Sequence, residues 1–149
     1  MDPMLERYNV SETKKYYCDI NSKVLTGVEV ITYKSKQKDE VSHVKKDYMD
    51  FLLDKLKFNV TEEYDKELKT FTISVLELNM YGEGKTREEA INDLLDSIIE
   101  FAQIYNEKID LFSKVESVEK QVYMMKILRS QSDKNNLKKE LGLQYAYKI

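Results

Sequence analysis

The strongest candidate for chemistry in the sequence is a run of carboxylates at Glu62, Glu63, Asp65 and Glu67. Two neighbouring carboxylates can hold a divalent metal ion or share acid–base work, as in metal-dependent nucleases and hydrolases. No fixed ligand spacing accompanies these four residues, and charged side chains of this kind commonly turn a hairpin. We therefore expect solvated turn residues here, and we keep a metal-dependent nuclease or hydrolase as the alternative from the enzyme class.

The segment NMYGEGKT at residues 79–86 ends like a phosphate-binding loop. That loop requires a glycine where this chain has Asn79, and it lies between a parallel strand and a helix. The flanking pattern here indicates an antiparallel hairpin that leads into a helix. We therefore expect Gly82 and Gly84 to allow a tight strand-to-helix turn rather than to bind a nucleotide.

Histidine and cysteine each occur once, as His43 and Cys18. These counts exclude a histidine-based triad, an internal disulfide and a cysteine-cluster metal site. We expect a structural role for His43 on a strand and a packing role for Cys18 on a helix. The sequence therefore indicates a binding protein with no enzymatic activity, no metal and no cofactor.

The chain has 149 residues, 42% of them hydrophobic, and a formal net charge of −3, values that exclude intrinsic disorder. The charge is unevenly distributed. Residues 1–57 carry 11 basic and 10 acidic side chains, residues 58–112 carry 5 and 13, and residues 113–149 carry 8 and 4. The chain shows neither a secretory signal nor an apolar run of about 18 residues. We therefore expect a cytoplasmic protein with no membrane association.

Hydrophobic periodicity predicts an α+β fold in three parts. The first part has the order β-α-β-β-α, and the second is an antiparallel three-stranded sheet packed on a long helix that opens with a capping box at Thr86 and Glu89. A helical C-terminal tail follows. The expected strands are 8–10, 28–33, 41–44, 58–64, 70–75 and 78–81, and the expected helices are 11–25, 47–56, 86–105, 117–129 and a short one through 141.

Basic side chains gather near the N-terminus of the chain, in the first helix and in the loop that follows the second strand. Lysine and arginine clusters at one end of a small fold bind the phosphate backbone of DNA, and dimerisation doubles such a cluster. We therefore expect DNA binding by Arg7, Lys14, Lys15, Lys34, Lys36 and Lys38.

Residues 8–53 resemble the N-terminal domain of the prevent-host-death (Phd/YefM) antitoxins. The similarity lies in a short strand, the helix start SETK, the helix end VLTG, the β-branched strand VEVITYK, a basic loop and the helix opening KKDYMDFL. The resemblance implies an N-terminal domain that forms a dimer and recognises operator DNA.

Residues 58–105 are similar to a second kind of antitoxin module, the HicB type. The similarity lies in an acidic hairpin that contains tyrosine, in Glu77-Leu78, and in the helix start GKTREEA at residues 84–90. This resemblance implies a sheet-plus-helix fold.

Together the resemblances imply the antitoxin of a bacterial toxin–antitoxin module, which binds a cognate toxin and represses its own operon as a homodimer or a larger assembly. A stand-alone transcriptional regulator or a structural dimer without a toxin is the alternative. The expected domains are a Phd/YefM-like domain (1–57), a HicB-like module (58–112) and a helical tail (113–149). The expected toxin-binding residues are Val118, Val122, Met125, Leu128, Leu137 and Leu141.

Overall fold

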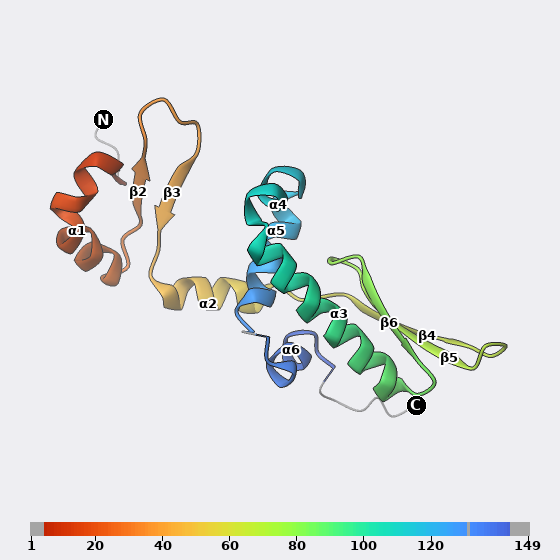
Figure 1. Cartoon of the computed structure of the whole chain (residues 1–149). Coiled ribbons are helices and arrows are strands. Elements are labelled where there is room, and N and C mark those ends of the chain that lie inside the picture. The colour runs from red at the N-terminus through yellow and green to blue at the C-terminus, as the bar shows by residue number, and fades with distance from the viewer. Residues whose placement is uncertain (1–4, 131, 144–149) are drawn as a thin grey trace. The chain divides into compact units, whose positions relative to one another are not determined.

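The structure is a computed structural model that describes residues 5–130 and 132–143. The chain divides into two compact units between Lys55 and Leu56 (Figure 1). Each unit has its own three-stranded sheet. Within the described residues, no helix is both long and apolar enough to cross a membrane.

The first unit contains a mixed sheet in the order β1-β2-β3, with β1 parallel to β2 and β3 antiparallel to β2. Helix α1 connects the two parallel strands and contacts both of them. Its buried residue Ile20 and the buried β2 residues Val30 and Thr32 form most of the small interior. The elements are β1 (Glu6–Asn9), α1 (Val10–Leu25), β2 (Val30–Tyr33), β3 (Glu40–His43) and α2 (Lys46–Lys55).

Helix α1 begins one residue earlier than the sequence predicts. Asn9 is the N-cap residue, and its short side chain accepts a hydrogen bond from the Ser11 backbone N–H at 3.1 Å. The helix ends as predicted near Gly27, whose φ of +103° suits a residue without a side chain. Helix α1 follows β1 in the sequence, precedes β2 and connects these two parallel neighbours of the sheet.

The second unit contains an antiparallel sheet in the order β4-β5-β6 and a long helix, α3 (Figure 1). The α3 apolar stripe, including Leu94 and Ile98, packs on buried β5 residues Ile73 and Val75. The elements are β4 (Val60–Asp65), β5 (Thr70–Val75), β6 (Met80–Gly84), α3 (Arg87–Glu107), α4 (Ile109–Val115), α5 (Val118–Leu128) and α6 (Lys134–Glu140). The α+β class and this arrangement of sheet, long helix and helical tail are confirmed.

Strand β6 lies directly against the first turns of α3, and this contact explains its two glycines. A Cβ atom on Gly82 would lie 2.3 Å from the Leu94 backbone nitrogen and 2.4 Å from the Ala90 carbonyl oxygen. A Cβ atom on Gly84 would lie 2.5 Å from the Glu89 Cβ. The expectation of a turn was wrong, because both glycines lie within β6 and serve close strand–helix packing.

The helices after α3 contribute to the same core as the sheet. Met124 and Ile127 of α5, Leu137 of α6 and Leu141 after it are buried in one cluster with the α3 stripe. Helix α4 was not predicted. Residues 144–149 of the expected tail lie outside the described residues.

A buried lysine, Lys126, joins the beginning of the second unit to its last helices. Its side chain is 5% exposed, its Nζ donates a hydrogen bond to the Leu56 carbonyl oxygen, and it lies 3.3 Å from a Glu140 carboxylate oxygen. The same Nζ lies 5.8 Å from the centre of the Phe58 ring. A buried ammonium is tolerated because it is both paired and hydrogen-bonded. The Lys126 side chain therefore connects Leu56, at the start of this unit, with Glu140 at the end of α6.

We predict that Gly82→Ala destabilises the second unit by about 2–3 kcal/mol or more, because the added methyl meets helix backbone rather than a movable side chain. Urea unfolding followed by circular dichroism measures the change. The neighbouring Glu83→Ala, at an exposed position of the same strand, is the control and should change stability by less than about 0.5 kcal/mol. Equal effects of the two substitutions would contradict the packing role.

Candidate functional site

The first unit brings the beginning of α1 and the β2–β3 loop to one end of its sheet. Asn9 pairs with Tyr33 in the β1–β2 register, so the strands end together. The Asn9 side-chain amide also donates a hydrogen bond to the Ser35 hydroxyl at 3.0 Å, which ties the helix start to the loop. We call this end of the unit, made of the α1 N-terminus and the loop 34–39, the basic end.

Five of the six predicted DNA-binding side chains are exposed lysines on α1 or in this loop: Lys14, Lys15, Lys34, Lys36 and Lys38. The sixth, Arg7, is engaged within the unit, where it forms an ion pair with Glu40 and lies 5.4 Å from the centre of the Tyr33 ring. The guanidinium holds the Glu40 carboxyl at a lowered pKa. The positive charge available at the basic end therefore comes from the lysines.

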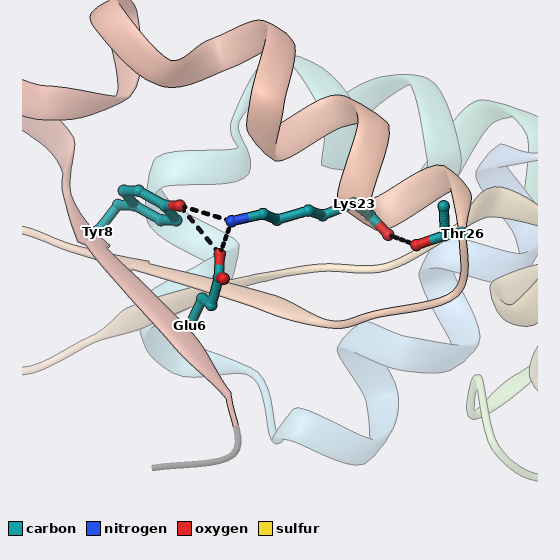
Figure 2. A network of polar contacts seen from close by, with 4 residues as sticks. All are labelled: Glu6, Tyr8, Lys23 and Thr26. Carbon is teal, nitrogen blue, oxygen red and sulfur yellow. Dashed lines mark hydrogen bonds and ion pairs between the residues drawn. The ribbon is translucent and has the colours of Figure 1, made fainter. Parts of the chain in front are cut away.

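A second polar network fastens β1 to the last turn of α1 (Figure 2). Lys23 pairs with Glu6 and donates a hydrogen bond to the Tyr8 hydroxyl at 3.2 Å, while that hydroxyl donates to Glu6 at 2.9 Å. The Thr26 hydroxyl donates to the Lys23 carbonyl oxygen at 2.6 Å. Hydrogen bonds from Lys23 and Tyr8 lower the pKa of Glu6, and the bond to Glu6 raises the pKa of Lys23.

Several large apolar side chains of the first unit are exposed. Tyr17 on α1 is 64% exposed and Phe51 on α2 is 62% exposed. Further large apolar side chains that are exposed in this unit are Leu5, Val10, Leu25, Val28, Val41, Tyr48 and Leu52. Apolar surface of this extent commonly marks a protein–protein contact.

The second unit carries an apolar groove between the end of α3, the start of α4 and the length of α5. Its volume is about 530 Å³. We name it the α3–α5 groove. Its lining residues are Tyr105, Ile109, Val118, Gln121, Val122, Met125, Leu128 and Arg129.

The predicted toxin-binding residues divide between this groove and the core. Val118, Val122, Met125 and Leu128 line the groove. Leu137 and Leu141 are buried in the core, so their side chains are not exposed to a partner in this structure. Four further residues that line the groove were not predicted, namely Tyr105, Ile109, Gln121 and Arg129. Tyr105 lies near the end of α3 and Ile109 at the start of α4, so no helical spacing within one element pointed to this pair.

Two of the carboxylates at residues 62–67 form contacts within the hairpin or between the hairpin and α3. Asp65 accepts hydrogen bonds from the Glu67 and Leu68 backbone N–H groups at 2.9 and 3.0 Å, and Glu62 lies 2.5 Å from the Arg87 guanidinium. Among the described residues, no group of three or more His, Cys, Asp or Glu side chains is placed to hold a metal ion. These carboxylates therefore stabilise a turn and a strand–helix contact.

The single histidine and cysteine have separate surroundings. The His43 Nε2 lies 3.0 Å from the hydroxyl of buried Thr32, which fits the structural role that we expect for it. Cys18 is exposed on α1, so the expected packing role was wrong. The polar positions around it on the helix leave it on the solvent side.

One family of known proteins matches nearly the whole chain. The PHD-like family, described as antitoxin of toxin-antitoxin, RelE / RelB, TA system, matches residues 4–141. This chain belongs to that antitoxin family. The family is a non-enzymatic class, so we set aside the nuclease or hydrolase alternative. The HicB-like module stays a prediction.

A solved structure supports the fold of this antitoxin. A crystal structure from Syntrophomonas wolfei subsp. wolfei, described as the antitoxin part of a proposed toxin/antitoxin system, is similar with a TM-score of 0.67. The sequences are 17% identical over 91% of this chain and 95% of that chain, so the likeness concerns the fold. No curated protein matches the sequence.

We predict that the first unit loses stability in acid through Glu6 and Glu40. Both carboxyls have a folded-state pKa below their ordinary value of 4.5, so their contribution is complete above that value and is lost as the pH falls through the folded pKa. Lys23 and Arg7 have raised pKa values, so their contribution is lost only at strongly alkaline pH. Thermal melting of the full chain at pH 3 to 7 measures this loss.

The matched control is the double variant Glu6→Gln and Glu40→Gln, which removes both titrating carboxylates. Its melting temperature should be lower than that of the wild type at pH 7 and should fall less between pH 5 and pH 3. An acid dependence as steep as that of the wild type would show that other carboxylates are responsible. Because these pairs are exposed, added salt should weaken the difference.

Proposed function

We propose that the two units of this antitoxin have two tasks. The first unit pairs with a second copy of itself and binds the operator DNA of its own operon, which represses transcription. The second unit covers the surface of a cognate toxin without a chemical step. The observation that carries the proposal is the first unit itself, which has an end of exposed lysines, a small buried interior and several exposed large apolar side chains.

The homodimer is supported by the small interior of the first unit. Its buried residues among those described are Ile20, Val30, Thr32 and Leu53, whereas Tyr17 and several other large apolar side chains remain exposed. A unit of about fifty residues buries too little surface for secure stability on its own. A second copy that covers this surface supplies the missing apolar burial.

Operator binding is supported by the arrangement of the basic end. Lys14 and Lys15 lie within the first two turns of α1, and the loop tied to the helix start carries Lys34, Lys36 and Lys38. The N-terminus of a helix carries a partial positive charge that attracts phosphate. A dimer presents two such ends, so a chain with a net charge of −3 still meets the DNA backbone with positive charge. The proposal places the protein in the cytoplasm, with its operator.

Toxin binding by the second unit is supported by family membership and by charge. Residues 58–112 carry 5 basic and 13 acidic side chains, and Asp93, Asp96 and Glu100 lie exposed along α3. An acidic surface is complementary to a toxin with a basic, RNA-directed surface. Family membership favours an antitoxin that binds a toxin over a regulator without a toxin.

We predict that Lys14→Ala combined with Lys15→Ala weakens binding to DNA from the region upstream of the gene. Each lost phosphate contact should reduce the slope of log affinity against log salt by about 1. Gel shifts over a range of salt concentrations measure both effects. The control replaces Lys45 and Lys46, an adjacent pair in the same unit at the start of α2, and should leave the slope unchanged.

Two results would overturn this part of the proposal. One is wild-type protein that fails to shift the upstream DNA at low salt. The other is wild-type protein that sediments as a monomer at micromolar concentration, since the apolar surface of the first unit would then have no second copy to cover it.

We predict that association with the toxin slows as salt increases. The partner used is the protein encoded by the neighbouring reading frame, and surface plasmon resonance gives the rate constants. Raising NaCl from 50 to 500 mM should lower the association rate constant by about tenfold, because salt screens attraction between opposite charges. A constant rate would remove the electrostatic argument while leaving binding itself intact.

A further inference from the structure

We propose that the uncovered face of the β4-β5-β6 sheet binds an arginine on the surface of the cognate toxin, with the guanidinium over Thr72 between the carboxylates of Glu63 and Glu83. This inference rests on the proposed function, since it names the surface by which the second unit holds a toxin of opposite charge. Three observations support it: a sheet face that nothing in the described part of the chain covers, two carboxylates with no partner there, and an exposed tyrosine beside them.

The two faces of this sheet differ. Ile73 and Val75 of β5 are buried against α3, and Gly82, which pairs with Ile73, approaches the helix backbone on the same face. Paired residues point to one side of a sheet, and neighbours along a strand alternate. The other face, which we call the open face, has no buried residue on the three strands. Its residues are Thr61, Glu63, Asp65, Thr70, Thr72, Ser74, Tyr81 and Glu83.

The register places a carboxylate on each side of Thr72. Glu63 of β4 and Glu83 of β6 are both directly opposite this residue. Since neighbouring strands lie about 4.8 Å apart, the backbones that carry the two carboxylates are about 10 Å apart. A guanidinium above Thr72 is within reach of both side chains, and its five N–H groups donate in several directions. One arginine can therefore bridge the two glutamates.

The two carboxylates are available to a partner. Within residues 5–130 and 132–143, neither the Glu63 nor the Glu83 carboxylate forms a hydrogen bond or an ion pair. On α3, by contrast, Asp93 accepts from the Glu83 backbone N–H at 2.9 Å, and Asp96 lies 2.6 Å from a lysine ammonium of α6. Lys85, which follows β6, donates from its Nζ to a hairpin carbonyl oxygen at 3.2 Å. Part of the charge nearby is therefore used within the unit, whereas that beside Thr72 is not.

Tyr81 supplies a flat apolar surface beside the two carboxylates. It is 61% exposed, precedes Glu83 by two residues on β6 and lies opposite Ser74. A residue on the diagonal of a strand pair is about 7–8 Å away, so the Tyr81 ring can reach a group above Thr72. A guanidinium stacks on an aromatic ring while its N–H groups donate in its own plane. A ring with two carboxylates therefore suits arginine better than the compact ammonium of lysine.

Charge and geometry favour a basic protein surface over the other molecules that could reach the open face. The phosphates of a nucleic acid are repelled by Glu63 and Glu83. A second copy of this chain, paired face to face about a two-fold axis, would bring like charges together. A divalent cation needs several oxygen ligands around one point, and the described residues hold no group of three or more potential ligands.

The test uses the full chain and the protein of the neighbouring reading frame, with affinity measured by isothermal titration calorimetry at low salt. Glu63→Gln and Glu83→Gln should each weaken binding by about tenfold, and together by more, because each removes a charged acceptor of the arginine and keeps the side-chain shape. The matched control combines Glu88→Gln with Glu107→Gln, at exposed positions of α3. It removes the same two charges and should change the affinity by less than about threefold.

Tyr81 tests the arginine independently of the carboxylates. Tyr81→Ala should weaken binding by about fivefold, whereas Tyr81→Phe should leave it nearly unchanged, because the ring rather than the hydroxyl meets the guanidinium. Equal losses in the two variants would overturn the stacked arginine. Thermal melting and the upstream-DNA gel shift show that each variant is folded and that its first unit is intact.

The outcomes separate this inference from the proposed function. Failure of the wild type to bind the neighbouring protein would overturn the proposed toxin binding, and this inference with it. Wild-type binding that Glu63→Gln and Glu83→Gln leave unchanged would overturn the role of the open face alone. Equal weakening by the α3 control would also overturn that role, because the effect would then be one of overall charge.

A photo-crosslinker identifies the occupant of the open face. Benzoylphenylalanine at position 81 should form an adduct with the neighbouring protein, and mass spectrometry should place the attachment within a few residues of an arginine. An adduct between two copies of this chain in the presence of the partner would overturn the inference, as would attachment in a segment without arginine. The control position is Tyr64, which pairs with Phe71 on the α3 side of the same sheet and should give little adduct.

Discussion

The close contact between β6 and α3 is the constraint on which the rest of the second unit depends. At Gly82 and Gly84 the strand approaches the helix backbone with no side chain between them. This approach fixes the position of α3 on the sheet, and Leu94 and Ile98 then fill the space above β5. The helices that follow pack on α3, so the α3–α5 groove also depends on where β6 holds the long helix.

The first unit is stabilised in a different way. It has a small buried interior, and its strands and helix are joined by exposed polar groups such as the Glu6, Tyr8 and Lys23 network (Figure 2). Exposed ion pairs contribute little when they are isolated, and the part that they do contribute varies with pH and salt, so the polar network adds little to the stability of this small interior. One chain thus combines a unit with a large buried core and a unit with a small one.

Local signals in the sequence were sufficient for much of the fold. Half of the predicted capping box forms, because Thr86 accepts from the Glu89 N–H at 3.1 Å, whereas the Glu89 carboxylate accepts from the Lys85 N–H at 2.9 Å and not from that of Thr86. Features that depend on distant partners were missed. Arg7 is paired with a carboxylate 33 residues away in the sequence. Lys126 is buried where it contacts Leu56 and Glu140, which are distant from it in the sequence or in another helix. The α3–α5 groove is lined by residues of three helices. No periodicity in one segment carries information about such partners.

The position of Lys126 has a consequence for the order in which the chain folds during synthesis. The first unit has all of its elements once Lys55 has left the ribosome. The second unit cannot complete its core until α5, α6 and Leu143 have followed, because Lys126 binds the Leu56 carbonyl and Leu143 fills the same core. Amino-terminal parts fold first as they emerge. The helices that form the groove therefore acquire their final packing only after residues up to Leu143 have been synthesised.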